Sequence, residues 1–345
     1  MQEIHKKKLI SLSIILILFV LGFLFFLYTG LSKAEDLPPS KKVVIGYVDW
    51  PGYVGLFIAH NLGFFREAGL EVDLQKYDSL KNLSVDYSAG KLDGRTNLTL
   101  DAIHEAYDGV RHKIVAVINY SLGADMIIGR KNIKSIKDLK GKKVAYDAKA
   151  LEEFFLNQAL DEYGLKLKDV QSVLVPVGER TELIKAGIVD AVVTYEPHAS
   201  KILDSSAYRV IYSSADAPGF IVDVWTFKTE FIKEHEETVR LFLEAYFRGV
   251  DFYKKNQKEG EMILAKQFDI KMEEATAGLL GVHILDSAEN KTAFTFASKI
   301  ESIFGNLRIV NKFLLSNHID DHIRHEDKDL SAIDTDYLID RRFLR

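Results

Sequence analysis

The sequence predicts an α/β fold with mostly parallel sheets. Between residues 43 and 227, short β-branched runs alternate with longer helical patterns, as expected for strands joined by crossover helices. The prolines support the same fold: three of them follow predicted strands and Pro218 precedes one. Ligands of open α/β sheets bind beyond the carboxyl ends of strands, so rigid turns there also suggest a cleft. Proline ends strands without any such role too, and both interpretations stay open.

Nine strands are expected from these runs, at Val43–Val48, Val72–Leu74, Ile114–Ile118, Met126–Ile128, Lys143–Ala145, Val173–Val175, Ala191–Thr194, Val210–Tyr212 and Val224–Phe227. Between them, helical periodicity is clearest at Gly55–Leu62, Leu151–Tyr163 and Arg180–Ala186. From Thr229 the alternation stops. The pattern is then helical through Glu237–Lys255, Glu259–Lys266, Glu273–Leu280 and Ala288–Phe304.

Residues 1–34 are expected to direct the chain to a membrane. Three lysines precede an almost unbroken apolar run over residues 9–28, close to the roughly 20 residues of a spanning helix. Positive charge stays in the cytoplasm, so the rest of the chain should lie outside. Ser32 and Ala34 fit a signal-peptidase site, but the run is longer than the about 7–15 apolar residues of an ordinary signal peptide. Cleavage and retention as a single anchor helix both stay open.

The remainder of the chain is acidic and contains no cysteine. At 345 residues the protein is long enough for roughly two domains of about 150 residues. Without residues 1–34, which hold four Lys and one Glu, 41 basic residues face 49 acidic ones. This balance argues against nucleic acid as a partner. The absence of Cys excludes disulfides, thiolate catalysis, Cys-ligated metals and lipid attachment through cysteine.

Composition also marks the ends of the predicted folded region. Residues 35–42 form a polar, semi-rigid linker containing two prolines, and residues 311–345 form a charged C-terminal tail. In this tail, His318 and His322 at i, i+4 could chelate a cation. Nothing beside them resembles a second shell of ligands, so a solvated tail is the simpler interpretation. We expect no metal and no cofactor.

Common catalytic signatures are absent from the sequence. It has no G-x-S-x-G elbow, no H-E-x-x-H helix, no Walker-type phosphate loop and no G-x-G-x-x-G turn. The commonest nucleophile, zinc-hydrolase and nucleotide sites therefore have no support, although catalytic triads are defined by geometry and not by sequence position.

Two groups of candidate ligand-binding residues follow predicted strands. Trp50 and Tyr53 flank the first strand–helix turn, where aromatic rings could stack on a planar or cationic ligand. Trp50 could equally fill the bottom of a lobe. Thr96, Asn97 and Thr99 precede a predicted helix near residue 101, where they could bind a polar ligand or simply cap that helix.

Further candidates bring carboxylates to the same crevice. They are Ser121, Asp125, Asp147, Tyr195, Glu196 and Asp223, each near a strand end or an expected crossing between lobes. Four converging carboxylates would attract an ammonium or guanidinium and would serve nitrate poorly. Arg95 and Arg180 could add a counter-charge for a zwitterion, although Arg180 is also typical of an exposed helix start. Asp125 and Asp147 are equally compatible with ordinary turn or cap roles.

Four stretches resemble a known family in their order and spacing. They are VVIGYVDWPGYVGLFIAHNLGFFREAGLEVDL (43–74), YSLGADMIIGRKNIKSIKDL (120–139), GIVDAVVTYEPH (187–198) and FIVDVWTF (220–227). Together they look like substrate-binding proteins of ABC importers for nitrate, sulfonates, taurine and thiamine-pyrimidine precursors. The likeness covers roughly residues 43–305. The ordered set is specific for the family but not for the ligand.

The resemblance implies a two-lobed type II periplasmic-binding-protein fold with a ligand cleft, here preceded by one N-terminal hydrophobic helix. Lobe one would comprise residues 43–130 and 218–310, and lobe two residues 131–217. Closure of such lobes needs only a few hinge residues.

The implied function is that of an extracytoplasmic solute-binding component of an ABC importer. A monomeric protein, which is not an enzyme, would capture a small amine-bearing or zwitterionic ligand, such as a taurine-like sulfonate, and deliver it to a permease and its ATPase. The alternatives are a pyrimidine-precursor synthase and a membrane-tethered sensor. The synthases of this superfamily are associated with a cysteine-rich motif, and its absence weakens the first alternative. The lipoprotein cysteine is missing too, so any attachment relies on residues 9–28.

Overall fold

The computed structural model describes residues 41–147, 151–196, 198–297, 302–317 and 333–344. The expected signal or anchor segment over residues 9–28 lies outside these ranges, as do His318 and His322. Within the described ranges, no helix is both long enough and apolar enough to cross a membrane. The last two residues of the expected linker, Lys41 and Lys42, begin the first strand.

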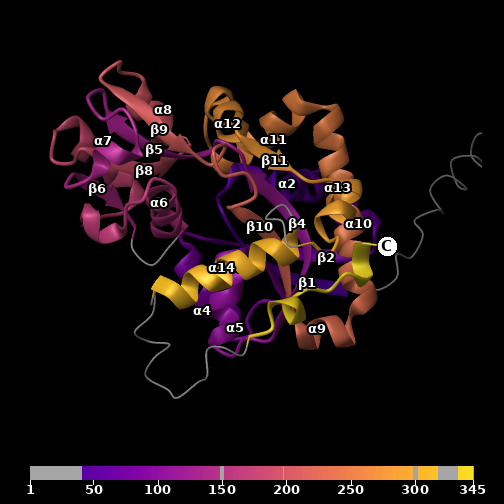
Figure 1. Ribbon diagram of the computed structural model, residues 1–345. Coiled ribbons are helices and arrows are strands. Elements are labelled where there is room, and N and C mark those ends of the chain that lie inside the picture. The colour runs from indigo at the N-terminus through magenta and orange to yellow at the C-terminus, as the bar shows by residue number, and fades with distance from the viewer. Residues whose placement is uncertain (1–40, 148–150, 197, 298–301, 318–332, 345) are drawn as a thin grey trace, which may run out of the picture. The chain divides into compact units, whose positions relative to one another are not determined.

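Six strands form the first sheet, in the order β11-β4-β10-β3-β1-β2 (Figure 1). Strand β1 pairs in parallel with β2 and β3, and β10 runs antiparallel between β3 and β4. The carboxyl ends of β1, β3 and β4 and the start of β10 therefore share one edge of the sheet. The strands are β1 (Lys41–Val48), β2 (Leu70–Tyr77), β3 (Gly94–Leu98), β4 (His112–Ser121), β10 (Val222–Lys228) and β11 (Val282–Ile284).

Helices pack on this sheet and complete lobe 1, which comprises residues 41–121 and 222–344 where described. The main core contact lies beneath α10, where Trp225 of β10 meets the rings of Phe242 and Tyr246 at centroid distances of 5.0 and 5.4 Å. The helical elements are η1 (Pro51–Tyr53), α2 (Val54–Asn61), α3 (Phe64–Glu67), α4 (Leu80–Ser88), α5 (Thr99–Tyr107), α9 (Thr229–Glu234), α10 (Glu236–Lys255), α11 (Gln257–Phe268), α12 (Met272–Leu279), α13 (Ser287–Ala293), α14 (Ile303–Asn317), η5 (Thr335–Leu338) and η6 (Arg342–Leu344).

Five strands form the second sheet, in the order β7-β6-β8-β5-β9, and define lobe 2, residues 125–213 (Figure 1). Strand β6 is parallel to β7 and β8, and β5 runs antiparallel between β8 and β9. The elements are β5 (Asp125–Arg130), η2 (Ile136–Leu139), β6 (Lys143–Tyr146), α6 (Leu151–Glu162), η3 (Leu167–Asp169), β7 (Gln171–Leu174), α7 (Val177–Lys185), β8 (Ala191–Tyr195), α8 (His198–Leu203) and β9 (Tyr208–Ser213).

The chain crosses between the sheets at residues 122–124 and 214–221. The expected first boundary at residue 130 is wrong, because residues 125–130 form β5 inside the second sheet. The apolar pattern of this strand suits either sheet, so it could not fix the boundary. The turn itself is made by Gly123, whose φ of 118° lies in the region that favours glycine. The second crossing contains the expected boundary at residue 218.

Three sequence-based expectations about elements differ from the structure. The polar segment Gly94–Leu98 is not among the expected strands but forms the buried strand β3. The helix expected over residues 288–304 is divided into α13 and α14, and α14 continues to Asn317 into the expected tail. The end of the chain is also folded where described, because Ile339 bridges Ile114 of β4 and Leu344 is buried.

Candidate functional site

The two lobes meet through the rings of Trp50 and Tyr195. Trp50 lies at the end of β1 and caps η1, and Tyr195 ends β8 in lobe 2. Their ring centroids are 6.0 Å apart in an edge-to-face arrangement. Tyr195 also lies opposite Asp125 in the pairing of β5 with β8. The aromatic turn of lobe 1 therefore reaches the strand ends of lobe 2.

Beneath this contact, Tyr53 holds Asp223 in place. The Tyr53 hydroxyl donates to Asp223 Oδ1 over 2.7 Å, and both side chains are buried. The pKa of Asp223 is raised to about 7, mainly by burial and also by the nearby Asp125 carboxylate, against the opposing effect of hydrogen bonds from Tyr53 and Asn119. Burial and the Asp223 charge also raise the Tyr53 pKa well above its usual value, so the phenol remains a donor.

Asp125 is the matching carboxylate of lobe 2. Only 5% of this residue is exposed, and burial raises its pKa to about 7, with Glu152 adding to the effect and a hydrogen bond from Ser121 opposing it. Neither Asp125 nor Asp223 forms an ion pair with any residue that the structure describes. Two buried carboxylates from different lobes thus interact with each other without a neutralising cation from the described part of the chain.

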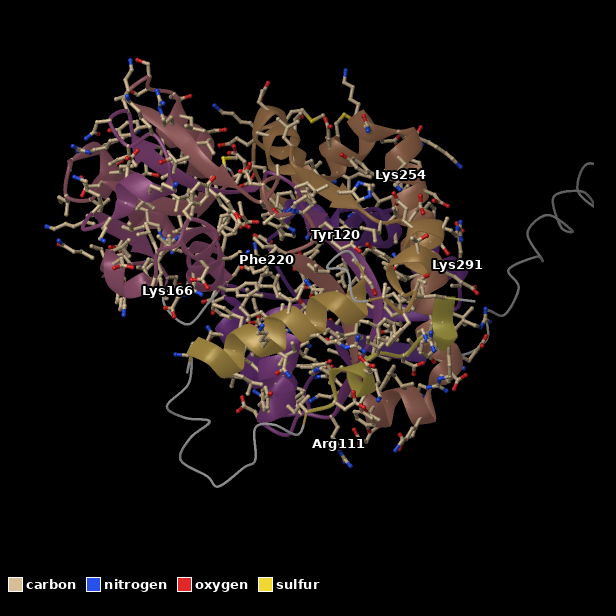
Figure 2. All side chains as sticks on the ribbon, in the orientation of Figure 1. Arg111, Tyr120, Lys166, Phe220, Lys254 and Lys291 are labelled. Atoms are coloured by element: carbon tan, nitrogen blue, oxygen red, sulfur yellow. The ribbon has the colours of Figure 1, made fainter. Side chains whose placement is uncertain are left out.

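Both crossings are joined by a pair of buried serines. Ser121 Oγ and Ser214 Oγ are 2.6 Å apart, and Ser214 Oγ also accepts the Gly123 N–H over 2.7 Å. The Ser214 N–H in turn donates to the Asp125 carbonyl over 2.9 Å. Ser121, predicted as a ligand residue, therefore ties the two crossings together beside Asp125. Phe220, labelled in Figure 2, supports the second crossing by stacking on Phe154 of α6 at 4.2 Å.

Additional charges line the strand ends of lobe 2. Burial raises the Glu152 pKa, and Arg180 and Asp147 also act on this carboxyl, in opposite directions. Arg180 is 1% exposed, which corrects the expectation of an exposed helix-start residue. Its guanidinium donates to the carbonyls of Val175 and Val193. It lies 3.5 Å from Glu152, and its Nη2 has no hydrogen-bond partner in the described chain. Asp147 is exposed at the end of β6.

Two predicted site residues, Asn97 and Glu196, form hydrogen bonds outside the candidate site. Asn97 projects to the other face of β3, where its amide donates to Glu105 Oε2 over 2.9 Å and to Thr226 Oγ1 over 3.3 Å. Arg95 pairs with Glu105 on that same face, so it supplies no counter-charge to Asp223. In lobe 2, Glu196 Oε2 accepts the Ser200 N–H over 3.1 Å at the start of α8. We therefore leave Asn97 and Glu196 out of the candidate site.

The two predicted threonines lie near the edge that carries Asp223. Thr96 is fully buried and pairs with Trp225, two positions from Asp223 along β10. Thr99 begins α5 directly after Leu98, which lies opposite Asp223 in the sheet. The side chain before this helix makes no capping hydrogen bond, so the expected cap formed by the residues before α5 is not seen.

Sequence reasoning missed Asn119 and Gly52. Asn119 lies opposite Asp223 in the pairing of β4 with β10, and its Nδ2 donates to the Gly52 carbonyl over 3.4 Å. A Cβ on residue 52 would lie only 2.6 Å from Asn119 Nδ2 and even closer to Trp50 Nε1. Glycine thus lets the indole and the amide approach each other. One signal was available: Asn119 interrupts the apolar strand IVAVINYS just before the first crossing.

Comparison with known proteins agrees with this architecture. A family model described as NMT1/THI5 like matches residues 50–260, more than half of the chain. The chain is 26% identical over 249 residues to a "Putative binding protein" of Brucella abortus, covering 69% of this chain and 73% of that protein. It is 28% identical over 158 residues to a "Putative thiamine biosynthesis protein" of Haemophilus influenzae, covering 45% of this chain and half of that protein's length.

A similar solved structure is the periplasmic aliphatic sulphonate binding protein SsuA from Escherichia coli. The TM-score is 0.69 at 18% sequence identity, over 82% of this chain and 94% of that one. This likeness confirms the two-lobed periplasmic-binding-protein fold that the sequence predicts. Taken with the match over residues 50–260, it shows that this chain belongs to the NMT1/THI5-like family.

Proposed function

We propose that the protein is an extracytoplasmic solute-binding component of an ABC importer, and that it takes a small solute carrying a protonated amine. Family membership and the binding-protein names of its relatives support the general role. The single observation that carries the ligand class is the pair Asp125 and Asp223, one from each lobe, buried and coupled without a neutralising cation among the described residues. An ammonium group would supply that charge.

The arrangement supports capture by closure of the lobes. Asp125 belongs to lobe 2 and Asp223 to lobe 1, so a cation between them contacts both lobes only when these are together. A ligand that makes these contacts only in the closed form stabilises that form. The stabilisation equals the difference between the binding free energies of the ligand to the closed and the open form. Delivery to a permease and its ATPase, and work as a monomer, belong to this proposal. So does attachment of an uncleaved chain through residues 9–28.

An amine linked to an anionic group is compatible with the same site. Among the described residues, Arg180 Nη2 and Trp50 Nε1 have no hydrogen-bond partner, and the Arg180 charge acts on Tyr195. These donors could bind the far end of a zwitterion such as an amino-sulfonate. A sulfonate without an amine would instead meet the carboxylates with its own negative charge, which costs affinity.

The test is a thermal-shift screen of the full-length protein. The compounds are matched sets that share a carbon skeleton and carry an amine, a hydroxyl or a sulfonate. A ligand that binds only the folded form raises Tm, and we expect Tm to rise with amines and amino-sulfonates alone. Stabilisation by simple sulfonates with none by amines would overturn the proposed ligand class. Mass spectrometry of the recovered compound separates binder from enzyme: a binder returns it unchanged, and a synthase converts it.

A further inference from the structure

The buried amide of Asn119 offers an acceptor beside the carboxylate pair. Asn119 is fully buried on β4, directly opposite Asp223 on β10, so both side chains project from the same face of the sheet. Its Nδ2 donates to the Gly52 carbonyl. Its Oδ1 is buried and accepts no hydrogen bond from any residue in the described ranges. A buried acceptor of this kind normally has a donor, and the described chain provides none.

Asp223 presents a buried carboxylate at the same place. Its Oδ1 accepts the Tyr53 hydroxyl over 2.7 Å, and a hydrogen bond from Asn119 also favours its charged form. Asp125 adds the carboxylate of lobe 2, whose charge acts on Asp223. The Asn119 amide on β4, the Asp223 carboxylate on β10 and the Asp125 carboxylate of lobe 2 thus lie near one another. Trp50 Nε1, which lies close to Gly52 and the Asn119 amide, is a buried donor without a partner among the described residues.

Charge and hydrogen bonding make different demands on a ligand here. Any cation, including a quaternary ammonium, would neutralise the carboxylates. Only a group with several N–H bonds would also satisfy the acceptors, and a buried acceptor left without a donor loses its hydrogen bond to water with no replacement. A primary ammonium has three N–H bonds directed to separate acceptors.

We propose that Asn119, together with Asp125 and Asp223, makes the protein selective for an unsubstituted primary ammonium over N-methylated amines. This inference rests on the proposed function, because it refines which amine the site accepts. It assigns Asn119 as a specificity-determining residue. Gly52 is the position that gives its amide room, since a methyl group there would collide with both Nδ2 and the indole of Trp50.

The test uses probes that differ only in N-methylation. Benzylammonium, its N-methyl and N,N-dimethyl forms and benzyltrimethylammonium share an aromatic part that can contact Trp50 and Tyr195. Benzyl alcohol serves as the uncharged probe. Titrations of the full-length protein are followed by tryptophan fluorescence at about pH 8, where carboxyls with pKa values near 7 are mostly ionised. We expect affinity to fall roughly tenfold for each of the last two N–H bonds replaced.

Two variants separate the hydrogen bonds from the charge. Asn119→Leu should lose about one of the two tenfold steps, because the amide acceptor is lost while the carboxylate acceptors remain. Asn97→Leu is the matched control: it removes another fully buried asparagine, but one bonded to Glu105 on the opposite face of β3. It should keep the wild-type order of affinities. Circular dichroism confirms that each variant is folded, and Asn119→Ser replaces Asn119→Leu if the latter is not.

The outcomes distinguish this inference from the proposed function. A graded loss with N-methylation that is clearly smaller in the Asn119 variant supports the inference. Benzyltrimethylammonium binding as tightly as benzylammonium would overturn the inference and leave an amine-binding protein in place. The same N-methylation preference in wild type and the Asn119 variant would remove Asn119 from this role. Binding of benzyl alcohol as tight as that of every amine would overturn the proposed function itself.

Discussion

The Tyr53 hydroxyl donates to Asp223 Oδ1 over 2.7 Å, and the two residues are 170 positions apart in the chain. One lies in the first strand–helix turn and the other at the start of the strand that returns from lobe 2. This bond fixes one carboxylate oxygen of Asp223. It is therefore a positioning contact, and Asp223 is the residue that would meet the ligand.

Replacing Tyr53 by Phe should weaken amine binding without removing it. The variant keeps the ring but loses the donor, so Asp223 holds its negative charge less readily and its pKa rises further. We expect a loss of about 1–2 kcal/mol in binding free energy, measured by calorimetric titration at about pH 8. Tyr246→Phe is the matched control, because Tyr246 is another fully buried tyrosine and packs on Trp225. Equal losses in both variants would contradict a specific role for Tyr53.

The ligand-free protein should become less stable as the pH rises through neutrality. Asp125 and Asp223 have pKa values near 7 when folded against 3.8 as the reference, so the folded state holds protons that the unfolded state releases. Their stabilising effect is present below about pH 4 and is lost as the pH rises through 7. Burial raises the pKa values of Asp101 and Glu152 as well, which acts in the same direction.

Asp223→Asn isolates one carboxyl from this total. At about pH 8 the free energy of unfolding of the variant should exceed that of wild type by up to about 4 kcal/mol, because the variant no longer buries that charge. Near pH 4 the two proteins should differ little. Urea denaturation at both pH values measures the difference. A variant that is equally destabilised at both would show that Asp223 contributes packing rather than a charge cost.

Binding of an amine at pH 7 should release protons. An ammonium between the carboxylates favours their charged forms, so groups that are partly protonated in the free protein lose their protons. Calorimetry in two buffers of different ionisation enthalpy gives the number released, which we expect to lie between about 0.5 and 1.5 at pH 7 and to approach zero at pH 9. Uptake of protons on amine binding would contradict the expectation that two carboxyl groups with raised pKa values lose protons to the solvent.

Gly52→Ala should impair binding by displacing Trp50 and Asn119. The added methyl group would stand 2.6 Å from Asn119 Nδ2, so the amide or the indole must move. We expect the binding free energy of the ligand to weaken by about 2 kcal/mol or more. The loss of folding stability, followed as Tm, should be smaller. Gly178→Ala is the control: this glycine lies in α7, no atom lies within 4 Å of the place where a Cβ would stand, and alanine there should stabilise by about 0.5–1 kcal/mol. Unaltered affinity in Gly52→Ala would show that the turn is looser than the structure indicates.

The sequence predicted the class of fold and much of the candidate site. Apolar runs bounded by turns identify strands such as β1 and β8, and the aromatic turn and acidic strand ends were found by their position after those strands. The strand β3 was missed because its residues, GRTNL, are polar; they are buried by bonding to one another and to Glu105. Periodicity reports apolar burial and gives no sign of a buried polar network.

The errors within the site have a related cause. Position after a strand does not tell which face a side chain takes, so Asn97 was included although it points away from Asp223. Glu196 was included although its carboxylate serves the start of α8. Asn119 was missed although it directly follows the expected strand Ile114–Ile118, because the sequence does not show which residue it faces. Its place opposite Asp223 depends on the pairing of β4 with β10, which joins segments about a hundred residues apart.

The most direct measurement compares amine binding by wild type and by the Asp125→Asn, Asp223→Asn double variant at about pH 8. The variant keeps the size of both side chains and removes both charges. Calorimetric titration with an amine that raises the wild-type Tm therefore measures how much the two carboxylate charges contribute to binding. We predict that binding falls at least a hundredfold while a neutral analogue with the same skeleton is unaffected. Equal affinity of both proteins for the amine would contradict the proposal that buried carboxylates from the two lobes select a cationic ligand.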